Sequence, residues 1–444
     1  MKSLFSNLAP AGAPAEHQQD NPLGSVLSSA ALVAGTTIGA GILALPAVTL
    51  PAGVLPSTVV MVGVWLYMLA SGLLVAEANL QAMGESGRAD IGLLATIRQT
   101  LGRGGAIAAG VVYVFIHYAL LVAYITRGGD ILAMALAQIM QWFGLSQPVL
   151  PMISPVVSLS GVSLWWGHVL FALLFGVVLY WGSERFVGRL NAVLVAIVVM
   201  TFGLLLALIL GQVEFSRWQV QHWEMVSALV PTMFVAFVYQ NVVPVVTTQL
   251  GGDGRRIRQA IGLGSLVPLL MFASWNAFIL GSSDADTASM GGIDPIEVLR
   301  QGQAHPLLGV AVSVFSEFAI ATSFIGFVFG LLSVFQDIFS PSFREKAGPL
   351  PLYLLIFLPP LVLSFADPNI FFEAIELAGA FGNSVLFGII PAVMAWKYRY
   401  KPAAETRESQ PLVPGGRVVL TVMIGVASAV VAQNALRYAE IIPK

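Results

Sequence analysis

Eleven long apolar stretches constrain the fold of this chain more than any other feature of its sequence. A membrane-spanning helix needs about 20 consecutive apolar residues. Stretches of roughly this length or more cover residues 25–50, 54–79, 106–141, 164–182, 188–211, 225–250, 258–281, 307–337, 349–366, 370–396 and 417–437. Their apolar residues run continuously, which is typical of helices and excludes a β-barrel. The sequence therefore predicts an all-α polytopic membrane protein with eleven transmembrane helices.

Composition agrees with a membrane protein and excludes several other classes. Only 10% of the residues are charged, against about 25% in soluble domains, and 57% are hydrophobic. The net charge of −2 gives no reason to expect a nucleic-acid partner. The chain has no cysteine, and its five histidines are far apart in the sequence and form no metal motif. We therefore expect no cofactor, and no obligatory protein partner is evident.

The distribution of lysine and arginine sets the expected orientation. Sixteen of the 21 Lys and Arg residues fall in segments on the same side as the N-terminus, four fall on the opposite side, and Arg127 lies inside a span. Positive charge gathers on the cytoplasmic side of membrane proteins. We therefore expect a bacterial-type inner-membrane protein with its N-terminus in the cytoplasm and its C-terminus outside.

The third and eighth stretches are longer than a bilayer requires, and their spacing indicates an internal repeat. An offset of 200 residues places 117–125 over 317–325, and 39–41 over 239–241. Five spans per unit is an odd number, so the second unit would be inverted relative to the first. The expected segments are a cytoplasmic tail 1–24, a first repeat 25–211, an inverted second repeat 225–397, a basic cytoplasmic linker 398–416, and an eleventh helix with a short outer C-terminus 417–444.

Two spans carry residues that break a helix near the middle of the membrane. Gly35, Gly39 and Gly41 lie within seven residues of span 1, and each glycine weakens a helix by about 1 kcal/mol relative to alanine. In span 6, Pro244 cannot donate to the carbonyl of Gln240. A half-helix N-terminus binds a carboxylate and an opposing C-terminus binds a cation, so paired breaks would suit a zwitterion. The alternative is that the small residues only let helices pack closely.

Four segments of the chain resemble a known family. They are Gly39-Ala40-Gly41-Ile42-Leu43-Ala44-Leu45-Pro46; Ala123-Tyr124-Ile125-Thr126-Arg127-Gly128-Gly129; Pro231-x-x-Phe234-x-x-Phe237 with Val243-Pro244; and Thr322-Ser323-Phe324-x-Gly326. Together they resemble the hydroxy/aromatic amino acid permeases, the tyrosine- and tryptophan-specific transporters of the amino acid–polyamine–organocation superfamily. The similarity extends over essentially all eleven spans. It implies a leucine-transporter-like five-plus-five inverted repeat, with helices 1 and 6 broken at the midplane, and secondary active uptake of an aromatic amino acid.

The resemblance also implies a substrate site at the two breaks. The glycine-rich segment 39–41 would hold the substrate carboxylate, and segment 239–241 would help to bind the amine and the side chain. Aromatic residues beside the breaks would form a pocket for the substrate ring. The predicted substrate-binding residues are Thr36, Thr37, Gly39, Ala40, Gly41, Tyr124, Phe237, Tyr239, Gln240, Asn241 and Phe324.

Charged residues inside the spans are candidates for coupling transport to a proton, because such residues are costly to insert and mostly functional. Arg127 and Asp130 share a helix face and would form either a gate beside the substrate or a self-neutralising structural pair. Glu317 is the first candidate proton carrier. Glu376, which shares a face of span 10 with Asn383, is the second.

A sodium ion is the alternative coupling ion. Sodium-coupled members of the superfamily bind Na⁺ with backbone carbonyls of span 1 and a Thr-Ser pair on span 8. The residues that match this spacing are Gly35, Ile38, Ala319, Thr322 and Ser323. Hydroxyls on apolar helices also bond to carbonyls of their own helix with no ligand present. The resemblance favours protons, and Na⁺ stays open.

These features predict a proton-coupled symporter that takes up aromatic amino acids by alternating access. Tyrosine is favoured, and tryptophan and phenylalanine are alternatives. A sodium-coupled symporter of another neutral amino acid and a non-transporting amino acid sensor on the same scaffold are the other readings. A channel would carry rings of charge, and an enzyme would need a nucleophile with its base or metal ligands. The expected partners are a small aromatic amino acid and the lipid bilayer.

Overall fold

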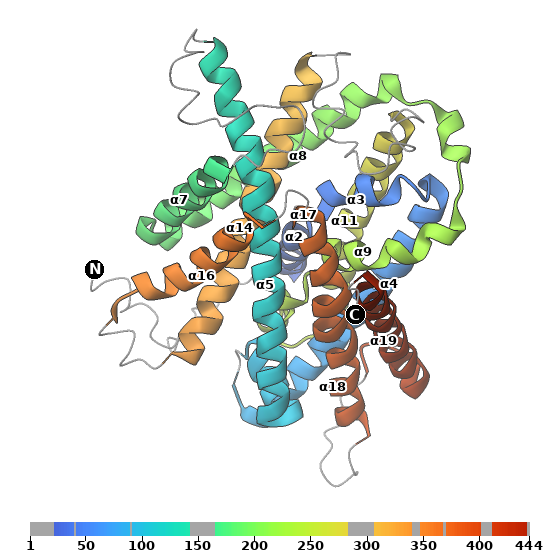
Figure 1. The fold of residues 1–444 in the computed structure, drawn as a ribbon. Coiled ribbons are helices and arrows are strands. Elements are labelled where there is room, and N and C mark those ends of the chain that lie inside the picture. The colour runs from blue at the N-terminus through green and yellow to red at the C-terminus, as the bar shows by residue number, and fades with distance from the viewer. Residues whose placement is uncertain are drawn as a thin grey trace.

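The computed structural model describes residues 22–39, 41–88, 91–142, 165–282, 306–339, 347–366, 370–400 and 411–441. Every regular element within these ranges is a helix, which confirms the predicted all-α class (Figure 1). Most of the predicted tail 1–24 and linker 398–416 lies outside the described residues.

The helices of the first predicted half are α2 (Pro22–Thr37), α3 (Gly41–Thr49), α4 (Val54–Ser86), α5 (Leu93–Trp142), α7 (Trp165–Trp181) and α8 (Glu184–Ile209). Three short 3₁₀ turns follow, η1 (Leu210–Gln212), η2 (Phe215–Gln219) and η3 (Trp223–Ala228). The remaining elements are α9 (Val230–Ala236), η4 (Gln240–Val242), α10 (Val243–Gln249), α11 (Gly254–Ser282), α14 (Pro306–Ile338), α16 (Leu350–Leu363), α17 (Ile370–Leu377), the π-helix η5 (Ala378–Ile389), α18 (Ile390–Arg399) and α19 (Gly416–Ile441).

Most of these helices are long and apolar enough to cross a bilayer. Among the described residues, eight segments meet this condition, and the bent pair α2–α3 makes a ninth if it forms one span. The apolar helices α7 and α16 have 17 and 14 residues and are shorter than a typical span of about 20. Each predicted stretch therefore contains helix, but the count of eleven spans stays a prediction.

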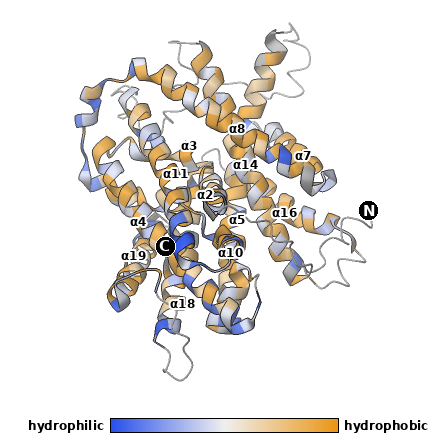
Figure 2. Cartoon of the chain, turned by 180° about the vertical axis from the view of Figure 1, so that it is seen from behind, coloured by the Kyte–Doolittle hydropathy of each residue, from blue (hydrophilic) through white to orange (hydrophobic). Residues whose placement is uncertain are grey.

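Most of the helices are coloured as hydrophobic along much of their length (Figure 2), and many of their large apolar residues are exposed. Val111, Met200 and Val418 are 66%, 65% and 71% exposed. Soluble monomers rarely expose continuous apolar surface of this kind, whereas hydrocarbon chains of lipids require it. The outer surface therefore agrees with a protein embedded in a membrane.

The break predicted in span 1 is present. The axes of α2 and α3 meet at a bend of 55°. The amide of Ile38 still donates to the carbonyl of Ala34 at 2.9 Å, but the amide of Ile42 donates to the carbonyl of Gly39, only three residues back, at 3.1 Å. The regular four-residue pattern of the helix is thus lost between Ile38 and Ile42.

The break predicted in span 6 is also present. Helix α9 ends at Ala236, and Tyr239, at φ −148° and ψ 0°, is outside the helical region. Pro244 lies in the first turn of α10. A proline is tolerated there because the first N–H groups of a helix have no partner within the helix. Pro244 therefore belongs to a new helix and does not kink an existing one.

Helices from the two predicted halves are interleaved. The longest helix, α5, packs against α14 of the second half, and α14 also packs against α8 (Figure 1). Helix α11 of the second half packs against both α2 and α4 of the first. The two halves therefore do not form separate domains. The inverted-repeat relation between them stays a prediction.

A buried ion pair joins α4 to the end of α18. The Nε and Nη2 atoms of Arg399 donate to the two carboxylate oxygens of Glu77 at 2.6 and 2.7 Å. The amide of Leu412 also donates to Glu77, at 3.0 Å, and Arg399 donates to the carbonyl of Val413 at 3.1 Å. The pair thus fixes the segment before α19 as well as two helices.

We predict that Glu77→Gln lowers the melting temperature of the purified protein. The substitution leaves Arg399 buried without its counter-charge, and breaking a buried pair in this way costs about 3–5 kcal/mol. Glu214→Gln is the control, because Glu214 and Arg217 form a more exposed pair of a kind that contributes about 0–1 kcal/mol. Equal melting temperatures for the two variants in detergent would contradict the prediction.

Candidate functional site

The two helix breaks meet at the glycines of span 1. A Cβ on Gly41 would lie 2.7 Å from the Cα of Ala236, the last residue of α9. A Cβ on Gly39 would lie 2.1 Å from the Oγ of Ser323 on α14. Contacts this close leave room only for hydrogen. The structure therefore brings the start of α3, the end of α9 and the middle of α14 together, while Ala40 lies outside the described residues.

The hydroxyls beside these glycines are bonded within their own helices. Thr36 donates to the carbonyl of Leu32 at 2.8 Å, and Thr37 donates to that of Val33 at 2.7 Å. On α14, Thr322 donates to the carbonyl of Ala319 at 3.0 Å. Serine and threonine commonly bond in this way in apolar helices. Thr322 and Ala319, two of the predicted sodium ligands, therefore bond to each other here.

Tyr239 and Gln240 hold the span 6 break against α4. Both are fully buried. The Tyr239 hydroxyl and the Gln240 Nε2 donate to the same carbonyl, that of Met68, at 3.1 and 3.2 Å. The Tyr239 ring lies so close to Gly72 that a Cβ there would be 2.7 Å from it. The next residue, Asn241, is half-buried, and its Oδ1 has no hydrogen-bond partner among the described residues.

The predicted aromatic residues occupy different surroundings. Tyr124 is buried, its hydroxyl interacts with the side chain of Ser323, and its ring meets Phe327 edge-on at 5.6 Å. Phe324 instead belongs to a buried cluster with Phe171, Phe175 and Phe357, at centroid distances of 5.2–5.6 Å. Phe237 contacts Phe272 at 5.2 Å. Tyr124 is thus the aromatic residue in contact with Ser323, whereas Phe324 and Phe237 pack in the core.

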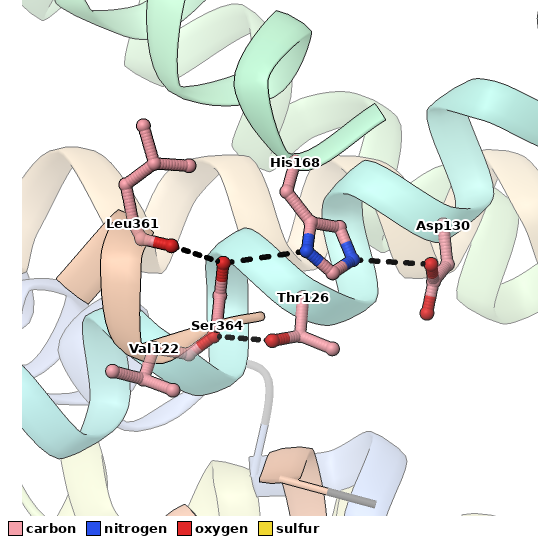
Figure 3. Close-up of polar contacts among 6 residues, drawn as sticks. All are labelled: Val122, Thr126, Asp130, His168, Leu361 and Ser364. Carbon is pink, nitrogen blue, oxygen red and sulfur yellow. Dashed lines mark hydrogen bonds and ion pairs between the residues drawn. The ribbon is translucent and has the colours of Figure 1, made fainter. Parts of the chain in front are cut away.

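Asp130 is bound by a residue that sequence spacing did not indicate. The Nε2 of His168 on α7 lies 3.2 Å from its Oδ1, and the Nδ1 of His168 lies 3.3 Å from the Oγ of Ser364, just after α16 (Figure 3). His168 is only 1% exposed. Arg127, one turn before Asp130, has its guanidinium carbon 5.7 Å from the ring centroid of Phe371 on α17. The contacts of Asp130, His168 and Ser364 join α5 to α7 and to the end of α16. The Arg127–Asp130 gate stays a prediction.

The two candidate proton carriers differ in their partners. Glu317 on α14 has a buried Oε2 with no hydrogen-bond partner in the described ranges. The Oε1 of Glu376 instead accepts a hydrogen bond from Arg437 on α19 at 3.0 Å. His117, the repeat-related partner of Glu317, bonds to the carbonyl of Tyr113 at 2.8 Å and contacts Phe327. Of the two carboxylates, Glu376 forms an ion pair, whereas Glu317 forms none with another residue in the described ranges.

Asn383 is a buried polar residue to which sequence reasoning gave no role. It lies within the π-helix η5, is 1% exposed, and neither its Nδ2 nor its Oδ1 bonds to any described residue. Its position on the same face of span 10 as Glu376 was the available signal. In the part of the chain that the structure describes, no cluster of His, Asp and Glu could hold a metal ion.

Comparison with known proteins supports a relation over almost the whole chain. The tryptophan/tyrosine permease family model matches residues 23–433. The tryptophan-specific transport protein of Pseudomonas aeruginosa (strain UCBPP-PA14) is 30% identical over 94% of this chain and 96% of its own. The tyrosine-specific transport system 1 of Haemophilus influenzae (strain ATCC 51907 / DSM 11121 / KW20 / Rd) is 29% identical, over 85% and 89%. The low affinity tryptophan permease of Escherichia coli (strain K12) is 25% identical, over 83% and 86%.

We predict that Gly41→Ala impairs the site and Gly63→Ala does not. The added methyl group at Gly41 meets the backbone of Ala236, which cannot rotate away, and it pushes α3 from α9. A methyl group at Gly63, on an exposed position of α4, meets nothing within 4 Å. Substrate uptake normalised to the amount of inserted protein measures the difference. Wild-type uptake by Gly41→Ala would show that the close approach is not needed.

Proposed function

Because the chain belongs to the tryptophan/tyrosine permease family, we propose that it takes up aromatic amino acids as a proton-coupled symporter working by alternating access. It is a permease and not an enzyme. Tyrosine is the substrate that we favour, with tryptophan and phenylalanine as alternatives. The proposed location is a bacterial-type inner membrane, with the N-terminus in the cytoplasm and the C-terminus outside.

The meeting of two helix breaks is the observation that carries this proposal. The start of α3 touches the end of α9 at Gly41 and Ala236. N–H groups in the first turn of α3 have no partner within the helix and lie at the positive end of its dipole, which attracts a carboxylate. Carbonyl groups at the ends of α2 and α9 lie at the negative ends of their dipoles, which attract an ammonium group. The backbone of an amino acid carries both charges and fits this arrangement.

We assign different roles to the residues around the breaks. Gly39, Ala40 and Gly41 bind the carboxylate, with Thr36 and Thr37 beside them. The Oδ1 of Asn241 has no hydrogen-bond partner among the residues that the structure describes, which suits it to accept a hydrogen bond from the ammonium group. Tyr239 and Gln240 shape the break, because their polar atoms already bond to α4 and to each other. We place the aromatic ring of the substrate next to Tyr124.

Glu317 is the proposed proton carrier. A carboxylate that takes up and releases a proton must not be held by a permanent counter-ion, and Oε2 of Glu317 is buried without a hydrogen-bond partner among the described residues. Glu376 is less suitable, since Arg437 neutralises it. The sodium alternative would need the carbonyl of Ala319 and the hydroxyl of Thr322 to separate and turn toward an ion, together with Gly35, Ile38 and Ser323.

Uptake into proteoliposomes tests the proposed function directly. We expect radiolabelled tyrosine to accumulate when a proton gradient is imposed without sodium. Accumulation that requires a sodium gradient would replace the proton by Na⁺ and move the coupling site to α14 and span 1. If the folded, inserted protein accumulates no aromatic amino acid under either gradient, the proposed substrate class is wrong.

We predict that Glu317→Gln abolishes the pH dependence of tyrosine uptake. The amide has nearly the shape of the carboxyl group but cannot gain or lose a proton at any pH used. Glu376→Gln is the matched variant and keeps the pH dependence of the wild type, because Glu376 is held by Arg437. Initial rates measured over a range of external pH, with the membrane potential clamped, give the profiles. If Glu317→Gln shows the same pH dependence of uptake as the wild type, another residue carries the proton.

A further inference from the structure

The Asn383 side chain differs from the other buried asparagines of this protein. Asn79 bonds to Ile91, Thr96 and Thr247, Asn276 bonds to Thr49 and Ser57, and Asn434 donates to Val430 within its own helix. Neither amide atom of Asn383 bonds to a described residue, although the residue is 1% exposed. Buried polar groups are nearly always hydrogen-bonded, so an exception needs an explanation. Binding of a substrate group to the Asn383 amide would explain this exception.

The local backbone also sets Asn383 apart. It lies in the middle of η5, a twelve-residue π-helix between α17 and α18. The side-chain hydroxyl of Ser384 donates to the carbonyl of Gly379, five residues back, at 2.9 Å. Segments of π-helix are rare and occur frequently at functional sites, because the wider turn changes the direction of a side chain relative to a regular helix. The unusual backbone thus coincides with the residue whose side-chain amide has no hydrogen-bond partner in the described part of the chain.

Contacts on either side of Asn383 place it beside α9, between the first turn of that helix and the break in span 6. One turn before it, Gly379 lies against the carbonyl of Pro231 in the first turn of α9. One turn after it, the carbonyl of Phe387 accepts a hydrogen bond from Ser71 of α4, next to Gly72, which touches Tyr239. Asn383 therefore lies alongside α9, between the level of Pro231 in its first turn and that of Tyr239 just beyond its end.

We propose that the Asn383 amide binds the hydrogen-bonding group on the aromatic ring of the substrate and thereby determines specificity; this inference rests on the proposed function. The helix ends at the breaks bind the two charged groups of the amino acid. The group on the ring is uncharged, and a neutral amide such as that of Asn383 suits it. An amide offers both a donor and an acceptor. The phenol hydroxyl of tyrosine uses both, the indole N–H of tryptophan uses the acceptor, and phenylalanine uses neither.

Asn383→Leu tests the inference, because leucine has a similar volume and no polar atom. We expect the ratio of Vmax/KM for tyrosine or tryptophan to that for phenylalanine to fall by about tenfold or more, since a site built to bond a hydroxyl or N–H discriminates against its absence. Uptake of phenylalanine itself should persist. Asn434→Leu is the control, because that asparagine is also buried but bonds only within α19. Its ratio should equal that of the wild type.

The three substrates separate the possible results. A larger fall for tyrosine than for tryptophan identifies the phenol as the group recognised, and the reverse identifies the indole. An unchanged ratio in Asn383→Leu, or a wild type that takes up phenylalanine as efficiently as both others, overturns the inference while leaving aromatic uptake in place. A wild type that takes up no aromatic amino acid overturns the proposed function instead.

A second measurement decides the case in which Asn383→Leu is inserted but takes up nothing. Binding of each amino acid to the detergent-solubilised protein is then followed by the rise in melting temperature that it causes. A loss of the difference between tyrosine or tryptophan and phenylalanine supports the inference. Retention of the wild-type difference in the variant overturns it.

Discussion

The lack of water inside a bilayer is the constraint on which this structure depends. Backbone groups freed by a helix break have no solvent partner there, so broken backbone must be buried by protein or line a cavity. Here the two breaks are buried against each other at Gly41 and Ala236. Tyr239 and Gln240 then fasten the second break to one carbonyl of α4. The candidate site exists because neighbouring helices support two segments that would be unstable alone.

The polar residues of the interior fall into three groups by where their hydrogen bonds go. Thr36, Thr37 and Thr322 bond within their own helices and fit apolar surroundings at little cost. Glu77 with Arg399 bonds between elements and fixes how they pack. The third group has buried atoms without a partner among the described residues and contains Asn241, Glu317 and Asn383. The first two groups explain the fold. In the third group, binding of a substrate or a proton would supply hydrogen bonds that the buried atoms do not form with described residues.

The surroundings of Asp130 show what sequence spacing can and cannot detect. Residues three apart on a helix are neighbours, so the spacing predicts that Asp130 pairs with Arg127. The observed partner of Asp130 is His168, from a helix that begins 35 residues later in the chain. Spacing within a helix contains no information about which side chain a neighbouring helix brings. Spacing also gave no indication that Ser323 contacts Gly39 and Tyr124, because these contacts depend on how α14 packs against the first spans.

The sequence alone determined that the chain is an all-α membrane protein, where two of its helices break, and which family it resembles. These properties follow from hydrophobic length, from glycine and proline, and from short motifs, all of which are local along the chain. Only the tertiary structure decided which polar groups are satisfied. In it, Tyr239 and Gln240 bond to α4, Glu376 pairs with Arg437, and Asn383 has no hydrogen-bond partner among the described residues. A hydrogen bond between helices depends on atoms that approach within about 3 Å, and such distances are fixed by packing between segments remote in sequence.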